Sequence, residues 1–286
     1  MAFEGLTIIG ESINDSVPST NLLYEAEDFD GIRDLARFQE KGGAKYIDVN
    51  VGTRSADTMR KAVEAATSVT SVPISVDSPD MELAEAGLRA CEPARGKPIL
   101  NSISPLRMEM FELYSILPFR PILLLTECLN ETGEGAPSRS IDDVYSAALL
   151  LFEKAKSLGI ANDDIIFDPG VAPIGSDSEG ALARLIGSLE KIHNNPEMKG
   201  VHASVGLSNF TVGLPPKRKL NGEPVKSPLE SALLTIAFPL GLDHVIGSVR
   251  RNYERLPEDS EPFQVVRECL DLGGFGSIKR VRKFYR

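Results

Sequence analysis

The chain alternates along its whole length between short apolar runs and stretches with helical periodicity. Each run is bounded by Gly, Pro or charged residues, as is typical of parallel strands that are covered on both faces. Eight such runs with helices between them predict an α/β fold, a single eight-fold βα (TIM-type) barrel. A doubly wound open sheet is the alternative, but no GxGxxG or P-loop pattern supports it. The expected strands are Leu6–Ile13, Ala44–Gly52, Pro73–Ser78, Pro98–Ser104, Pro121–Cys128, Asp164–Val171, His202–Asn209 and His244–Val249.

The helical stretches have recognisable ends. Ser140–Gly159 carries apolar residues at helical spacing, with Ser140 and Asp143 as candidate caps at its start. The last helix is expected over Glu261–Leu272. Because the chain shows no linker, low-complexity tract or break in composition, we expect residues 1–286 to form one domain.

Composition narrows the class of partner. Lys plus Arg number 31 against 41 Asp plus Glu, so the formal net charge is −10 and the surface repels nucleic acid and anionic membranes. The longest apolar runs, such as Pro121–Thr126, are too short to span a bilayer. Three cysteines without CxxC spacing and an N-terminus without a leader pattern are typical of a reduced, cytoplasmic protein. The absence of Trp argues against a carbohydrate-binding barrel.

Polar residues close several of the expected strands. In a βα barrel the carboxyl ends of the strands meet at one mouth, where the chemistry of such enzymes takes place. Taken singly, each of these residues could be only a turn former or a helix cap. Together they form an amide- and carboxylate-rich set without a Lys, His or Cys cluster, so neither a nucleophile–base pair nor a metal site is expected. The set comprises Asn50, Asp77, Asn101, Asp168 and Asn209.

This set is suited to a flat heterocycle with many donors and acceptors. A pterin ring presents an exocyclic amine beside a ring N–H, and one carboxylate can accept both. Asn amides can serve the remaining ring nitrogens and the carbonyl, because each amide carries a donor and an acceptor. A hydrolase that uses Asp77 and Asp168 as acid and base is an alternative.

Six ordered motifs resemble the pterin-binding family, which includes dihydropteroate synthases and methyltetrahydrofolate:corrinoid protein methyltransferases. The resemblance covers nearly the whole chain, and it implies that Asp77, Asn101 and Asp168 hold the pterin. It also implies that Asn209 contacts the nitrogen that carries the methyl group and is the catalytic residue. Glu11, Asn14, Asn50 and Ser102 belong to the same motifs and are assigned to the pterin site. The motifs are Gly10-Glu11-Ser12-Ile13-Asn14, Asp48-Val49-Asn50-Val51-Gly52, Val76-Asp77-Ser78, Leu100-Asn101-Ser102, Phe167-Asp168-Pro169 and Gly206-Leu207-Ser208-Asn209.

Two details separate the branches of that family. A dihydropteroate synthase would carry an Arg-Lys pair after the Ser of strand seven, whereas this chain has Asn209-Phe210 and so resembles the methyltransferases. The branch usually has Arg at the position of Ser12, which puts the role of the first strand in doubt. The resemblance implies methyl transfer between tetrahydrofolate, or 5-methyltetrahydrofolate, and a corrinoid (cobalamin), in a homodimer. A dihydropteroate synthase-like condensing enzyme and a non-catalytic folate-binding protein are the alternatives.

The chain offers no cobalamin ligand of its own. Asp243-His244-Val245-Ile246-Gly247 departs by one residue from the corrinoid signature Asp-x-His-x-x-Gly and lies on an expected strand. We therefore expect a separate corrinoid protein as partner, with the methyl group passing from it to tetrahydrofolate. His202 and His244 are expected at the bottom of the barrel in structural roles. Cys128 is expected near the mouth, either as a reactive thiol or as a buried inert one.

One connection is unusually long. Residues Thr211–Lys226 join strand seven to its helix and contain four basic residues against a single acid, Glu223. Connections of this length are commonly functional lids or mobile segments. The basic residues would contact the partner protein or the glutamate tail of folate, unless they are only solvated surface. They are Lys217, Arg218, Lys219 and Lys226.

Overall fold

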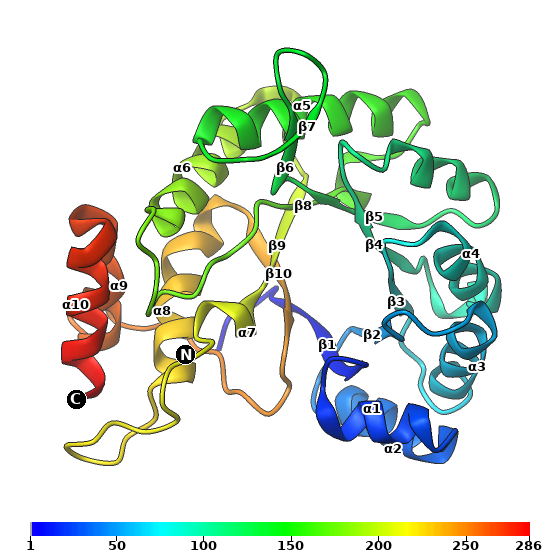
Figure 1. Ribbon diagram of the computed structural model, residues 1–286, viewed down its shortest axis with the longest axis horizontal. Coiled ribbons are helices and arrows are strands. Elements are labelled where there is room, and N and C mark those ends of the chain that lie inside the picture. The colour runs from blue at the N-terminus through cyan, green and yellow to red at the C-terminus, as the bar shows by residue number, and fades with distance from the viewer. Residues whose placement is uncertain (1) are drawn as a thin grey trace.

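A computed structural model describes residues 2–286 and shows a closed barrel of eight parallel strands in the order β1-β10-β9-β8-β5-β4-β3-β2 (Figure 1). The prediction of a TIM-type barrel is confirmed, and the open-sheet alternative is wrong because β1 pairs with both β2 and β10. Every expected run overlaps one barrel strand, although β1, β5 and β10 extend beyond the expected bounds. The strands are β1 (Thr7–Asn14), β2 (Tyr46–Asn50), β3 (Ile74–Asp77), β4 (Ile99–Ile103), β5 (Arg120–Leu124), β8 (Ile166–Asp168), β9 (His202–Gly206) and β10 (Leu242–Gly247).

Helices surround the barrel, but their alternation with the strands is not strict (Figure 1). The connection from β4 to β5 holds a 3-10 helix, η2 (Met108–Ser115), and a small hairpin of β6 (Glu127–Leu129) and β7 (Gly135–Pro137) follows β5. Two helices follow each of β1, β9 and β10. The α-helices are α1 (Pro18–Glu25), α2 (Phe29–Lys41), α3 (Ala56–Thr67), α4 (Met81–Ala90), α5 (Ile141–Ser157), α6 (Ala181–His193), α7 (Leu207–Phe210), α8 (Lys226–Ala237), α9 (Glu261–Leu272) and α10 (Gly274–Tyr285).

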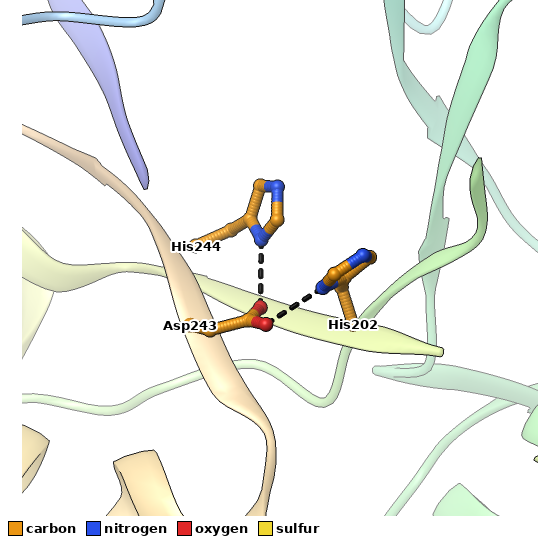
Figure 2. Close-up of side chains that lie close together, drawn as sticks. All are labelled: His202, Asp243 and His244. Carbon is orange, nitrogen blue, oxygen red and sulfur yellow. Dashed lines mark hydrogen bonds and ion pairs between the residues drawn. The ribbon is translucent and has the colours of Figure 1, made fainter. Parts of the chain in front are cut away.

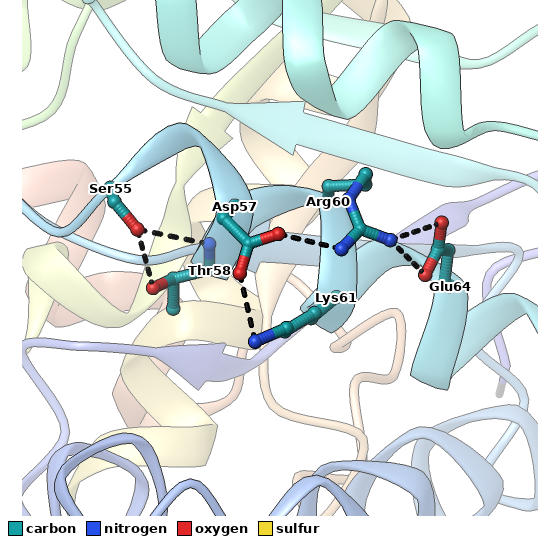
Figure 3. Close-up of polar contacts among 6 residues, drawn as sticks. All are labelled: Ser55, Asp57, Thr58, Arg60, Lys61 and Glu64. Carbon is teal, nitrogen blue, oxygen red and sulfur yellow. Dashed lines mark hydrogen bonds and ion pairs between the residues drawn. The ribbon is translucent and has the colours of Figure 1, made fainter.

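Local sequence signals explain where helices begin. At α5, the Ser140 side chain accepts from the backbone N–H of Asp143, and the Asp143 side chain accepts from the backbone N–H of Ser140, which is the expected capping box. At α3, Ser55 caps the first turn, and Asp57 accepts hydrogen bonds from Arg60 and Lys61 on the solvent face (Figure 3). Such contacts lie one turn apart and favour the helical conformation.

The barrel interior is layered. Ile9, Ile99, Ile122 and Ile166 are fully buried and form a cluster inside the barrel, with Tyr46 and Ile246 packed against it. Because side chains alternate along a strand, residues two positions further on share the inward direction. Asn101 therefore points inward like Ile99, and Asp168 like Ile166, one step nearer to the mouth of the barrel. The apolar layer separates a polar mouth from a polar floor.

No helix within residues 2–286 is both long and apolar enough to cross a membrane.

Candidate active site

A cavity of about 730 Å³ opens at the carboxyl ends of the strands. Six residues expected in the pterin site line it, namely Glu11, Asn14, Asp77, Asn101, Asp168 and Asn209. Asn50 and Ser102 do not line this cavity. The structure therefore brings together most of the predicted set at one place, and it adds residues that the strand-end pattern did not single out. Among these are Ser12, Asp48, Ser208, Ser248 and Arg250.

The first strand reaches the cavity through an irregularity. The register of β1 against β2 shifts between Gly10 and Ile13, which is the signature of a bulge. As a consequence Glu11 and Ser12, although adjacent in sequence, both line the cavity. The backbone N–H of Ser12 donates to the buried side chain of Gln39 at 2.9 Å, which holds the bulge against α2. Ser12 thus stands at the cavity wall with a short side chain.

Two carboxyl groups lie side by side on β2 and β3. Asp48 is buried and accepts a hydrogen bond from the Ser75 hydroxyl at 2.6 Å, and Asn50 Nδ2 donates to Asp77 Oδ2 at 2.9 Å. Burial, together with the Asp77 charge, raises the pKa of Asp48 well above its usual range. Burial also raises the pKa of Asp77. We interpret the pair as a protonated Asp48 that donates to the Asp77 carboxylate.

Asn50 is therefore a support for Asp77 and not a wall residue. Its side-chain oxygen accepts from the backbone N–H of Gly52 at 2.8 Å, so both ends of the amide are engaged within the protein. Asp48 and Asn50 are two positions apart and so share one face of the strand, but only Asn50 was expected in the pterin site. The sequence did indicate Asp48, because it lies two residues before Asn50 and therefore deeper in the barrel. A carboxyl group at that depth needs a partner such as Asp77.

Asp168 is a buried acid of the cavity, and no charged group pairs with it among the described residues. Burial raises its pKa to about 7, opposed only by the hydrogen bond from Gly170. That bond joins the Gly170 N–H to Oδ1 at 2.8 Å, and Oδ2 accepts none from the described residues. Gly170 has a φ of +75°, and a Cβ there would lie 2.3 Å from Thr126 Cγ2. Glycine is thus required to present this N–H to Asp168.

Asn209 does not end a strand. β9 stops at Gly206, and Asn209 lies on α7, one short turn of helix that follows. This corrects the predicted strand His202–Asn209. Two carboxyl groups hold the turn, the half-buried Glu11 and the fully buried Glu230, since the Ser208 hydroxyl donates to Glu11 and the Thr211 hydroxyl donates to Glu230.

Glu230 is fully buried on α8 and accepts from Arg251, which follows β10. Burial raises the pKa of Glu230, and burial likewise raises the pKa of Glu11, where the Ser208 bond and the Arg251 charge oppose the shift. Arg251 thus pairs directly with Glu230, and its charge also lowers the pKa of Glu11. The residue that carries the predicted chemistry is positioned by side chains from three other parts of the barrel.

The long connection after α7 is more ordered than expected. An isolated β-bridge joins Lys217 to Pro224. Arg218 pairs with Glu261 on α9 at 2.7 Å, and its guanidinium lies 4.4 Å from the ring centroid of Phe284 on α10. Arg218 thus has a structural role, because its charge is engaged in holding α9 and α10, and its expected contact with a partner or the folate tail stays a prediction. Of this connection, Val212 lines the cavity.

Cys128 lies in β6 and is buried, consistent with an inert thiol.

At the opposite end of the barrel the two histidines are joined by Asp243 (Figure 2). His202 Nδ1 lies 2.6 Å from Asp243 Oδ2, and His244 Nδ1 lies 2.7 Å from Asp243 Oδ1. The donor atoms lie close enough together to suggest a metal centre. Arg120 argues otherwise, because its guanidinium can only donate and lies 3.2 Å from His244 Nε2.

The proton positions follow from that contact. Nε2 of His244 must accept from Arg120, so Nδ1 carries the proton and donates to Asp243 instead of binding a cation. Burial raises the pKa of Asp243, but the hydrogen bonds from His202 and His244 outweigh it and hold the value at about 2. Burial lowers the pKa of His244, as expected of a neutral ring. We call His202, Asp243, His244 and Arg120 the floor cluster.

The fold and the mouth together define a βα-barrel enzyme scaffold with a carboxylate- and amide-lined cavity. Residues 13–247 match the family of pterin binding enzymes, and the chain belongs to this family. A relative from Eubacterium limosum, a methylcorrinoid:tetrahydrofolate methyltransferase, is 26% identical over 251 residues, which cover 84% of this chain and 84% of the relative.

Solved structures of dihydropteroate synthases share the fold. The 7,8-dihydropteroate synthase of Vibrio fischeri ES114 aligns with a TM-score of 0.57 and 19% identity, covering 93% of this chain and 92% of that one. The Yersinia pestis synthase, solved with a pterine-sulfa conjugate, aligns with a TM-score of 0.56 and 17% identity, covering 93% of this chain and 95% of that one. At these identities the likeness concerns the barrel itself.

Proposed function

We propose that this protein transfers a methyl group between N5 of tetrahydrofolate and a corrinoid carried by a separate protein, in the direction of tetrahydrofolate. The observation that carries the proposal is the mouth cavity, where carboxyl groups and amides converge and the described lining residues include no Cys, Lys or His. The relative from Eubacterium limosum supports the branch, because its name states methylcorrinoid and tetrahydrofolate as its substrates.

The pterin ring is assigned to the deep part of the cavity. The Asp168 carboxylate, with Oδ2 open to a ligand, would accept from the adjacent amine and ring N–H of the pterin. Asn101 and Asp77 line the same wall and would serve the remaining ring atoms. A charge-assisted hydrogen bond contributes about 1.5–3 kcal/mol, so a small number of these contacts accounts for micromolar affinity.

Asn209 is proposed to act at the reacting nitrogen. In the direction of tetrahydrofolate, the N5 lone pair forms the new N–C bond, and the electron pair of the broken cobalt–carbon bond stays with the corrinoid. N5 then loses its proton to solvent. The Asn209 amide would orient the lone pair and follow the change in charge at N5, while the anchored α7 turn keeps the amide in place.

A separate protein must bring the corrinoid to this mouth. No histidine of the described chain lines the cavity, and His244 is committed to Asp243 and Arg120 on the floor. The barrel therefore supplies pterin binding and orientation, and the methylated corrinoid enters as a substrate.

A condensing enzyme like dihydropteroate synthase is the second candidate. The shared fold favours it, whereas Asn209-Phe210 in place of an Arg-Lys pair does not. A non-catalytic folate-binding protein would use the same wall residues and differs only in the absence of turnover.

The deciding experiment mixes the protein anaerobically with tetrahydrofolate and methylcobalamin, alone and bound to a corrinoid protein, and follows the cobalt absorption spectrum. Demethylation of the corrinoid with formation of 5-methyltetrahydrofolate is expected. Condensation of a dihydropterin pyrophosphate with p-aminobenzoate would support the synthase instead. Folate binding without either reaction would leave the protein as a carrier.

A further inference from the structure

The charges of the mouth cavity are unevenly placed. Its carboxyl groups are largely buried, with Asp48 and Asp168 less than one tenth exposed. The only cation among the described lining residues is Arg250, which follows β10 and is exposed. A ligand that fills the cavity therefore meets acids and amides at one end and a guanidinium at the other.

The Arg250 side chain is held but not neutralised. Its guanidinium carbon lies 4.9 Å from the ring centroid of Phe38 on α2, and its backbone N–H donates to Ser248 Oγ at 3.3 Å. No carboxylate among the described residues pairs with it, whereas the neighbouring Arg251 is bound to Glu230. Stacking on an aromatic ring orients a guanidinium and leaves its N–H groups available to a ligand.

We propose that Arg250 binds a carboxylate of the p-aminobenzoyl-glutamate tail and so makes the site selective for folates over simple pterins. This inference rests on the proposed function, since it requires the pterin ring to lie at the carboxyl-lined end. The tail carries two negative charges at the end of the molecule remote from the pterin. Without a cation at the opening, these charges would meet only the field of Glu11, Asp77 and Asp168.

The other basic residues near the mouth do not take this role. Arg218 is engaged by Glu261, and Lys217, Lys219 and Lys226 do not line the cavity. Arginine also matches the task, because its planar guanidinium donates two parallel hydrogen bonds to a carboxylate, a geometry that the lysine ammonium does not reproduce.

The test compares two ligands under anaerobic calorimetry, tetrahydrofolate and 6-methyltetrahydropterin, which lacks the tail. Arg250→Ala should weaken tetrahydrofolate binding about 10-fold, as expected for one charge-assisted contact at an exposed site, and leave the tetrahydropterin unchanged. Arg250→Lys should restore part of the loss. Added salt should weaken tetrahydrofolate binding to the wild type more than to Arg250→Ala.

Arg267→Ala is a matched control, because Arg267 is an exposed arginine on α9 that does not line the cavity. Equal losses for both ligands in Arg250→Ala would show that the residue only shapes the cavity, and would overturn the inference. Unchanged tetrahydrofolate affinity with a slower reaction toward the corrinoid protein would assign Arg250 to the partner and overturn it as well. Failure of the wild type to bind either ligand would reject the proposed function itself.

Discussion

The pKa values of acids at the two ends of the barrel are shifted in opposite directions. At the mouth, burial dominates and raises the pKa values of Glu11, Asp77 and Asp168. At the floor, hydrogen bonds from two imidazoles hold the pKa of Asp243 at about 2 despite its burial. Arg120 completes the floor by donating to His244 and to the Tyr46 hydroxyl.

This difference separates a binding end from a stabilising end. A buried acid that lacks protein donors costs free energy in the ligand-free chain and gains it back only when a ligand supplies them. A buried acid with satisfied donors contributes to stability at once and has no capacity left for a ligand. In TIM barrels, residues at the carboxyl ends of strands serve function and those at the amino ends serve stability. The pKa values follow the same division here.

The largest effect is expected from removing a mouth acid. Asp168→Ala should weaken tetrahydrofolate binding by about 2–4 kcal/mol, because pterin donors would lose their shared acceptor. Calorimetry measures the affinity, and Asp259→Ala serves as an exposed control outside the cavity. An unchanged affinity in Asp168→Ala would sink the assignment of this residue.

Asn209 should affect the rate more than the binding. Asn209→Ala is expected to slow single-turnover methyl transfer about 10- to 1,000-fold, since one preorganised polar contact to the reacting nitrogen is lost. Tetrahydrofolate affinity should fall less than the rate, because the contact tightens as charge changes at N5. A single-turnover rate equal to that of the wild type would make Asn209 an ordinary residue of the α7 turn.

A substitution in the floor cluster should change the free energy of unfolding and leave tetrahydrofolate binding unchanged. Asp243→Ala leaves the Nδ1 donors of His202 and His244 without their acceptor and should lower the free energy of unfolding by about 1–3 kcal/mol. Because the folded pKa of Asp243 is depressed to about 2, its contribution is present above pH 4 and is lost only as the pH falls toward 2.

Chemical denaturation at pH 7 measures the loss, and calorimetry with tetrahydrofolate provides the comparison with the mouth. If Asp243→Ala weakened folate binding as much as Asp168→Ala, the separation of the two ends would be refuted.

The smallest expected effect is the pH dependence of folding stability that Asp168 causes at the mouth, which is opposite in sign to that of Asp243. Burial raises the pKa of Asp168 to about 7, so the folded chain holds this proton more tightly than the unfolded chain. The contribution of Asp168 to stability is therefore full below the unfolded pKa and is lost as the pH rises through 7. Asp168→Asn, which stays neutral, should gain about 1 kcal/mol relative to the wild type between pH 6 and pH 8. Denaturation series at both pH values measure this difference, and its absence would place the pKa near the ordinary range.

Much of the fold could be predicted because it depends on local pattern. Short apolar runs between helical stretches are buried on both faces of a sheet only if helices cover them, and the α5 capping box lies entirely within one segment. Asp77, Asn101 and Asp168 could be placed at one mouth because parallel strands share a carboxyl edge and side chains alternate along them. Periodicity and chain direction suffice for these predictions.

The remaining features depend on contacts between distant segments. Asn209 lies on a turn of helix whose neighbouring residues Ser208 and Thr211 are held by Glu11 and Glu230, both distant in sequence. The charge state of Asp48 depends on Asp77 in the next strand, 29 positions away in sequence.

The basic residues show the same limit. Arg218, in the most basic segment, is engaged by Glu261, whereas Arg250, which no motif marked, stands at the cavity. A sequence specifies which groups can be charged, but burial and neighbouring partners decide which of those charges remain available to a ligand, and only the closed barrel sets both.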